Sequence, residues 1–263
     1  SSIGIAMCPD AGEDPESICK SADTAMYLAK KMGRNNYQFF SQELHEETMK
    51  RIHLENDLRR ALDQSEFTLF YQPKVDMNAN VIGMEALIRW QHGKQGIITP
   101  DKFIPMAEKT NHILELSDWV LRRACEQWVQ WNSQGAELDR IAVNLSGRQI
   151  NDDDFASTVE TILKEAGCPP DRLELEVTER IMMRDAESRS HSLDGLQELG
   201  IRISIDDFGT GYSSLSHIKN LPIDKLKIDK SFVEGIPSDT NDEEIITAII
   251  TLGKSINLTV IAE

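Results

Sequence analysis

The sequence lacks the long hydrophobic segments and paired cysteines that mark membrane and secreted proteins. No run of about 18 apolar residues occurs, the length at which a membrane-spanning helix becomes a candidate, so we expect no membrane segment. The first residues have neither the basic region nor the apolar stretch of a secretory signal. The cysteines are scattered, without metal-ligand spacing, at Cys8, Cys19, Cys125 and Cys168. We interpret them as reduced thiols and expect a cytoplasmic protein, with any membrane anchor upstream of this chain.

Basic residues are scarce relative to acidic ones. The chain has 28 Lys and Arg against 44 Asp and Glu, a formal net charge of −16 over 263 residues. Non-specific nucleic-acid binding depends on basic patches that meet phosphates, so we expect no nucleic-acid polymer as a partner. A small phosphate-bearing ligand is still compatible with this charge where metal ions neutralise the carboxylates. The hydrophobic content of 40% is sufficient for a substantial core.

The stretch 203–211 reads ISIDDFGTG, which predicts a buried strand followed by a glycine-rich loop. The adjacent carboxylates of Asp206 and Asp207 repel each other unless a cation lies between them, and Mg²⁺ and Mn²⁺ prefer such oxygen ligands. Gly209 and Gly211 allow the loop to turn tightly beside a ligand. The alternative is a solvated Asp-Asp turn, because Asp and Gly also favour ordinary turns.

The N-terminal part of the chain predicts an incomplete domain and a linker. Residues 1–40 predict a β-α-β unit, with strands at Ser2–Met7 and Asn36–Phe40 and a helix at Asp14–Met32 between them. A unit of this size buries too little surface to fold alone. We therefore expect 1–40 to be the end of a larger domain, and 41–64 to be a helix that links it to a second domain at 65–263.

From residue 65 onward, strands and helices alternate. The first two strands predict a hairpin, and the rest predict βαβ units around a parallel sheet, which is either a barrel or a doubly wound sheet. The predicted strands are Phe67–Val75, Val81–Trp90, Arg140–Ser146, Leu173–Glu179, Arg202–Phe208, Lys225–Val233 and Leu258–Glu263. The predicted helices are Pro100–Lys109, Ile113–Asn132, Asp152–Ala166, Asp185–Leu199, Tyr212–Asn220 and Asp242–Ile256.

Polar side chains occur late in the predicted strands, on the face opposite their apolar neighbours. They are Glu85, Asn144, Glu176, Asp206, Asp207, Lys227 and Glu263. Barrel enzymes carry their chemistry at the C-terminal ends of many strands, whereas a doubly wound sheet uses fewer, so the pattern favours a barrel. Oxygen ligands from several strands suit one or two Mg²⁺ or Mn²⁺ ions. A pair of such ions can stabilise both the attacking and the leaving oxygen when a phosphodiester is hydrolysed.

Each of these polar residues also has an ordinary structural alternative. The alternatives are a Glu85–Arg89 pair, an Asn144 hydrogen bond to the backbone, a Glu176–arginine pair and a Lys227–Asp229 pair. Each alternative is common by itself, but their joint occurrence at successive strand ends favours a functional site.

The same residues lie in a series of ordered motifs. In chain order these are EALIRW at 85–90, NLS at 144–146, EVTE at 176–179, DDFGTG at 206–211, LKID at 226–229 and VIAE at 260–263. The series resembles EAL domains over about residues 60–263. This resemblance implies a TIM-like (βα)8 barrel whose first strand is antiparallel to the rest. It also implies hydrolysis of cyclic di-GMP to linear pGpG in bacterial second-messenger signalling.

The resemblance to EAL domains also implies a role for each site residue. It implies metal ligands at Glu85, Asn144, Glu176, Asp206 and Asp207. Lys227 matches the lysine near the catalytic water and Glu263 the general base, while Glu179 matches the glutamate that steadies the loop after Asp207. Gln72 and Arg89 match residues that contact substrate. The alternative is an EAL module that binds cyclic di-GMP as a sensor without cleaving it.

Two further expectations concern the ends of the chain. The run 22–35, ADTAMYLAKKMGRN, resembles the C-terminal end of GGDEF domains, the diguanylate cyclase module. Lys30 and Arg34 match phosphate-contacting positions there, or are simply basic residues in the last turn of a helix. The EAL family continues with another strand and helix after the position of Glu263, so we expect a barrel truncated before its last strand, and we consider a homodimer through the EAL domain.

Overall fold

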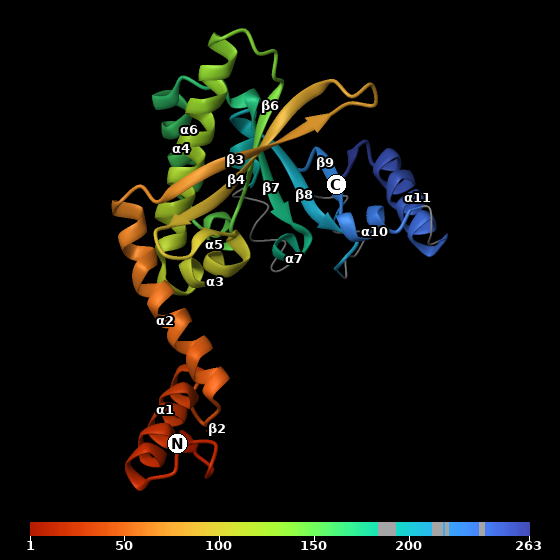
Figure 1. The fold of residues 1–263 in the computed structure, drawn as a ribbon. Helices are drawn as coiled ribbons and strands as arrows, with labels where there is room; N and C mark the ends of the chain where they lie inside the picture. The colour runs from red at the N-terminus through yellow and green to blue at the C-terminus, as the bar shows by residue number, and fades with distance from the viewer. Residues whose placement is uncertain (184–192, 212–217, 219–220, 237–239) are drawn as a thin grey trace. The chain divides into compact units, whose positions relative to one another are not determined.

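The computed structural model describes residues 1–183, 193–211, 218, 221–236 and 240–263, and it divides into two units, Ser1–Gln64 and Ser65–Glu263 (Figure 1). None of the helices in the described part of the chain is long and apolar enough to cross a membrane.

The first unit is a small β-α-β arrangement followed by a long helix. Its elements are β1 (Ile3–Ile5), α1 (Pro15–Lys31), β2 (Tyr37–Phe39) and α2 (Gln42–Asp63). The two strands are parallel, and α1 packs on them. Asp14 begins α1, because its side chain accepts hydrogen bonds from the backbone N–H groups of Glu16 and Ser17. The β-α-β prediction and the predicted helix after it therefore match the structure to within a few residues.

The second unit is built on one curled sheet. Its strands are β3 (Phe67–Val75), β4 (Val81–His92), β5 (Gly96–Ile98), β6 (Arg140–Asn144), β7 (Leu173–Thr178), β8 (Arg202–Phe208), β9 (Lys225–Ile228) and β10 (Thr259–Ala262). The order across the sheet is β10-β9-β8-β7-β6-β4-β3, with β5 paired to β4. β3 and β4 are antiparallel, whereas the neighbouring strands from β4 to β10 are parallel. The sheet forms a curled half-barrel in which the first strand is antiparallel, as predicted.

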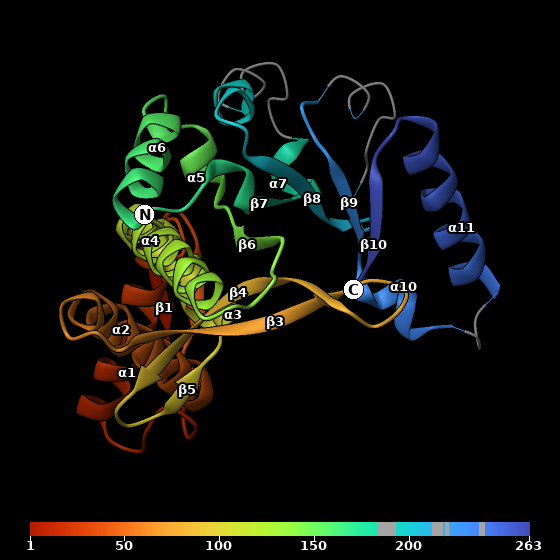
Figure 2. The same ribbon diagram turned by 90° about the horizontal axis from the view of Figure 1, so that it is seen from above.

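Helices cover the outer side of this curl (Figure 2). The helical segments are α3 (Pro100–Thr110), α4 (His112–Ser133), α5 (Gly147–Ile150), α6 (Phe155–Ala166), η1 (Pro170–Arg172), α7 (Glu179–Met182), α10 (Lys230–Glu234) and α11 (Thr240–Ser255). α4 packs against β3, β4 and β6 on one side of the sheet, and α11 packs against β9 and β10 at the other end. The predicted helix 212–220 lies almost entirely outside the described residues, and the predicted helix 185–199 partly so.

Strand alternation separates an apolar layer from a polar one. In β7, Leu173, Leu175 and Val177 are fully buried, and these alternate with Glu174 and Glu176, which are also buried. The apolar set faces the covering helices. The glutamates face the interior of the curl, where a buried charge requires a partner. This interior is where the polar strand residues meet.

Three of the predicted strands end earlier than expected because a helix begins there. The predicted strand Arg140–Ser146 ends at Asn144, since Ser146 is the N-cap of α5. The predicted strand Lys225–Val233 ends at Ile228, since the Asp229 side chain accepts the N–H of Ser231 and begins α10. Likewise β7 ends at Thr178, and Glu179 is the first residue of α7. The short elements β5, α5, η1, α7 and α10 were not predicted, because runs of three to five residues carry almost no periodic signal.

Candidate active site

Lys227 lies at the centre of a ring of carboxylates inside the curl. It is on β9, and its side chain is only 2% exposed. Its Nζ lies 2.7 Å from Glu176, 3.0 Å from Asp206 and 3.1 Å from both Glu85 and Glu263. The carboxylates thus come from β4, β7 and β8 and from Glu263, which directly follows β10. The pairing of Lys227 with Asp229, one of the structural alternatives, is not the arrangement that forms.

A backbone irregularity brings Asp206 and Asp207 to the same side of the sheet. Side chains of adjacent strand residues normally point to opposite faces. Here the register between β8 and β9 shifts between Ile205 and Phe208, and Asp207 has a φ of 54°, in the left-handed region that non-glycine residues rarely adopt. Oxygens of Asp206, Asp207 and Glu263 consequently lie within 4.8 Å of one another.

The carboxylates form two overlapping groups that share Asp206. Oxygens of Glu85, Glu176 and Asp206 lie within 4.8 Å of one another, as do those of Asp206, Asp207 and Glu263. Asn144 joins the first group, because its Nδ2 donates a hydrogen bond of 2.8 Å to Glu85. The predicted metal ligands are therefore adjacent in space, and the Glu85–Arg89 pair and the Asn144–backbone bond are not what forms.

Glu179 holds the loop that follows Asp207. Its Oε2 accepts the backbone N–H of Gly209 at 2.8 Å and of Gly211 at 3.3 Å. A Cβ atom on Gly211 would lie 2.7 Å from Glu179 Oε1, so a larger residue at this position would displace the Glu179 carboxylate. Gly209 has a φ of 103°, which also favours glycine. Glu179 therefore lies where the resemblance places the glutamate that steadies this loop, in contact with residues up to Gly211. Residues 212–217 of the loop are outside the described part of the chain.

Gln72 and Arg89 lie at the rim of the carboxylate ring and not in it. Gln72 pairs with Glu85 across the β3–β4 hairpin and is exposed. Arg89 is half-buried on β4; its guanidinium donates to the Ile88 carbonyl and lies 5.6 Å from the ring centre of Phe70. Glu85 and Arg89 are four residues apart on one strand, so they share a face.

Comparison with known proteins identifies the second unit. The EAL domain family matches residues 55–263, and the diguanylate cyclase GGDEF domain matches residues 1–36. The chain belongs to the EAL domain family. EAL domains have TIM-barrel-like folds, in agreement with the curled half-barrel of β3 to β10.

This EAL protein is similar in sequence to proteins named as cyclic di-GMP phosphodiesterases. It is 44% identical over its whole length to the bifunctional diguanylate cyclase/cyclic di-GMP phosphodiesterase MucR of Pseudomonas aeruginosa, and 36% identical to the cyclic di-GMP phosphodiesterase PdeR of Escherichia coli. It spans only 38% and 40% of the lengths of these two proteins. The solved phosphodiesterase of MucR, in a c-di-GMP complex, superposes with a TM-score of 0.76 at 44% identity, covering 81% of this chain and 85% of that one.

Burial and charge act in opposite directions on the ionisable groups of the EAL site. Burial raises the pKa of Asp207 to about 6, and the neighbouring Asp206 charge adds to this shift. Burial also raises the pKa of Glu176, more strongly than Lys74 and Lys227 lower it. For Lys227, burial by itself would lower the pKa, but the charges of Glu176, Asp206 and Glu85 raise it instead. Lys227 is thus a permanent cation among carboxylates.

A second buried ion-pair network lies beside the carboxylate ring of the EAL domain, and we did not predict it from the sequence. Lys74 of β3 donates to both Glu174 and Glu176, and Lys225 of β9 also donates to Glu174. Burial would raise the pKa of Glu174, but the charges of Lys74 and Lys225 lower it to about 2. Lys74 therefore joins this network to the site through Glu176. The only sequence signal for this network was the presence of Lys74 in a run of strand-forming residues, Phe67–Val75.

We expect Glu179→Ala to reduce turnover of the EAL domain by about 10- to 100-fold while the fold survives, because two backbone N–H bonds to a charged acceptor are lost. Glu179→Gln keeps one acceptor oxygen, so its turnover rate should lie between those of Glu179→Ala and the wild type. Steady-state kinetics, metal titration and circular dichroism would measure the effects. Unchanged rate and metal dependence in Glu179→Ala would contradict this role.

Proposed function

We propose that this EAL domain is a metal-dependent phosphodiesterase that hydrolyses cyclic di-GMP to linear pGpG in bacterial second-messenger signalling. The observation that carries the proposal is the ring of carboxylates around Lys227, at the mouth of a half-barrel. The names of MucR and PdeR, and the c-di-GMP complex of the MucR phosphodiesterase, support the choice of substrate.

The residues present suit Mg²⁺ or Mn²⁺. Both ions prefer hard oxygen ligands, and the two groups of oxygens within 4.8 Å supply carboxylates from several strands. Glu85, Asn144, Glu176, Asp206 and Asp207 would hold one or two ions, with Asp206 common to both groups. When bound, such ions polarise the phosphodiester and lower the pKa of a water molecule.

The chain's own residues would then bind the substrate and move the proton. Glu263 Oε1 lies 3.1 Å from Lys227 Nζ, and the Glu263 side chain is 27% exposed. Partial burial of this carboxyl raises its pKa, which suits it to accept a proton from the attacking water. The Lys227 ammonium would hold that water and offset negative charge on the phosphate oxygens. At the rim, Arg89 and Gln72 would contact the substrate, with Arg89 suited to a phosphate oxygen.

The test is release of pGpG from cyclic di-GMP with and without divalent metal. We expect no turnover in EDTA and full recovery with Mg²⁺ or Mn²⁺. Because a proton competes with metal for Asp207 below its pKa of about 6, metal affinity should fall as pH falls through that value, by about tenfold per pH unit. Product analysis by chromatography and metal titration between pH 5 and 8, roughly, would measure both effects.

Two results would contradict the proposal. Turnover that persists in EDTA would exclude the metal dependence. Binding of cyclic di-GMP without any product, with Mg²⁺ or Mn²⁺ present, would make the chain a sensor and not an enzyme.

A further inference from the structure

A second layer of polar side chains lies beneath the carboxylate ring, toward the amino ends of the parallel strands. Glu174, Ser204 and Lys225 each stand two residues before a member of the site on the same strand, so they share its face. The site residues above them are, in the same order, Glu176, Asp206 and Lys227. Since a strand rises about 3.3 Å per residue, this lower layer lies about 7 Å below the ring.

Lys74 joins the lower layer to the ring. It lies on β3, at one end of the strand order of the sheet, and its side chain is 14% exposed. Its Nζ donates a hydrogen bond of 3.0 Å to Glu174 and another to Oε1 of Glu176. The residue opposite Lys74 in the β3–β4 hairpin is Gly83, which has no side chain to fill the interior between β3 and β7. The long lysine side chain can therefore reach both glutamates of β7.

Glu174 does not need Lys74 as a partner. Its Oε1 accepts the Ser204 hydroxyl at 2.9 Å, and its Oε2 accepts a hydrogen bond from Lys225. One lysine is enough to neutralise this carboxylate, yet the lower layer holds two lysines and one glutamate. The additional positive charge therefore serves Glu176, the other carboxylate that Lys74 contacts.

The two oxygens of Glu176 are held by different lysines. Oε1 accepts from Lys74 below the ring, and Oε2 accepts from Lys227 at its centre, at 2.7 Å. Lys227 divides its contacts among four carboxylates and so fixes none of them alone. Among the residues that the structure describes, Lys74 forms ion pairs only with Glu174 and Glu176. Lys74 is thus the contact that sets the orientation of the Glu176 carboxylate.

We propose that Lys74 is a positioning residue of the metal site: it fixes the Glu176 carboxylate through Oε1 and leaves Oε2 facing the ring for the ion. This inference rests on the proposed function and adds a residue to it. Partners of this kind, which hold a metal ligand from its far side, orient the ligand before the ion arrives. Without Lys74, ion binding itself would have to order the Glu176 side chain, at a cost in affinity.

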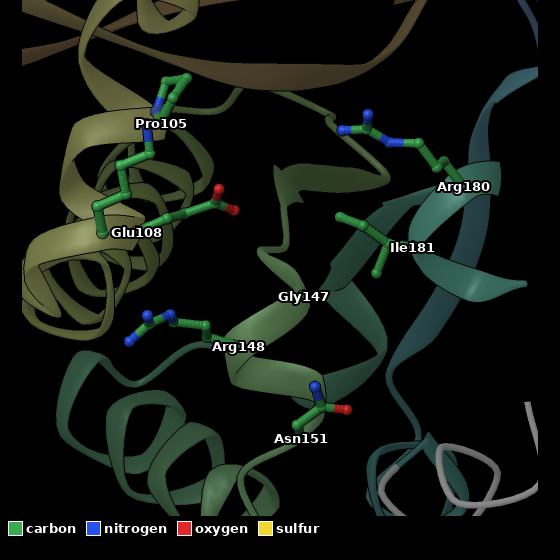
Figure 3. Close-up of a pocket in the computed structure, with 8 residues that line it drawn as sticks. Pro105, Glu108, Gly147, Arg148, Asn151, Arg180 and Ile181 are labelled. Carbon is green, nitrogen blue, oxygen red and sulfur yellow. The ribbon is translucent and has the colours of Figure 1, made fainter. Parts of the chain in front are cut away.

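The lower layer is separate from the cavities beside the ring. One cavity, of about 390 Å³, is lined by residues of α3, α5 and α7 and by Asn151 (Figure 3). A second is lined by residues that include Thr178, Asp207 and Gly211. Lys74 lines neither of these two cavities. Its effect should therefore appear in the affinity for metal and not in KM for the substrate.

The test is titration of the chain with Mn²⁺ in the absence of substrate, by isothermal calorimetry. We expect Lys74→Met to bind Mn²⁺ about 10- to 100-fold more weakly than the wild type, because the outer support of a ligand is lost. Lys74→Arg keeps a charged donor and should recover most of the affinity. The turnover of Lys74→Met should rise toward that of the wild type as Mn²⁺ is increased, with KM for cyclic di-GMP unchanged.

A role of Lys74 as a charge alone predicts the opposite result. Removing a cation from beside a cluster of carboxylates makes the site more negative, which would tighten Mn²⁺ binding. Equal or tighter binding by Lys74→Met would therefore overturn the positioning role. Partial loss of fold would lower the number of binding sites per chain, which the same titration measures, and leave the affinity of the folded fraction unchanged.

Lys225→Met is the matched control, because it removes a lysine of the lower layer that pairs with Glu174 and does not contact Glu176. It should bind Mn²⁺ as the wild type does. If it weakened binding as much as Lys74→Met, the effect would belong to the whole layer and the inference would be wrong. Mn²⁺ binding and turnover by the wild type, with unchanged affinity in Lys74→Met, would overturn this inference alone. No Mn²⁺ binding by the wild type would overturn the proposed function together with it.

Discussion

Replacing Lys227 with methionine is expected to abolish detectable turnover and to destabilise the metal-free protein by about 3–5 kcal/mol. The reason is that Lys227 is the cation shared by Glu85, Glu176, Asp206 and Glu263. Its removal takes the positive charge away from the buried carboxylates of Glu85 and Asp206, while Glu176 keeps its pairing with Lys74. A divalent ion would supply the missing positive charge. The loss of stability should therefore be much smaller in Mg²⁺ than in EDTA, as measured by urea unfolding in both conditions.

Lys225→Met is the matched control for this prediction. Lys225 also lies on β9 and pairs with a buried glutamate, Glu174, which is outside both carboxylate groups. This variant should lose stability to a similar extent in EDTA and in Mg²⁺, and should keep most of its turnover. If Lys227→Met were equally destabilised with and without metal, the carboxylate ring would not be a metal site.

Replacing Glu85 with glutamine is expected to reduce turnover by about 10³-fold, equivalent to ~4 kcal/mol of transition-state stabilisation, since a metal ligand is lost. The amide oxygen of the new side chain can still accept the Asn144 hydrogen bond. One negative charge leaves a cluster in which several carboxylates surround one lysine. The metal-free protein should therefore be as stable as the wild type or more stable, opposite to Lys227→Met.

Kinetics with saturating Mg²⁺ and urea unfolding in EDTA would measure both effects of Glu85→Gln. Glu115→Gln, on the exposed side of α4, is the control and should change neither quantity. A variant that lost stability in EDTA while keeping turnover would show that Glu85 serves the fold and not the site.

Much of the fold could be predicted from local pattern. The strands β3 and β8 match the predicted bounds, because a run of strand formers between turn residues gives a strong period-two signal. The alternation of strands and helices implied parallel pairing from β4 onward, and the polar residues late in each strand implied a barrel-like site. The ordered motifs added the family, which the comparisons confirm.

The sequence by itself determined which residue types stand at the strand ends, and hence the class of ligand that the site suits. Only the tertiary structure decided how those residues meet. With regular strand alternation, the side chains of Asp206 and Asp207 would point to opposite faces of the sheet. The shift in the β8–β9 register and the φ of 54° at Asp207 bring them to the same side instead. Likewise Lys74 and Glu176 are 102 residues apart, and no local rule pairs them. They meet because the sheet curls until β3 and β7 face one interior, where a buried charge needs a partner of opposite charge.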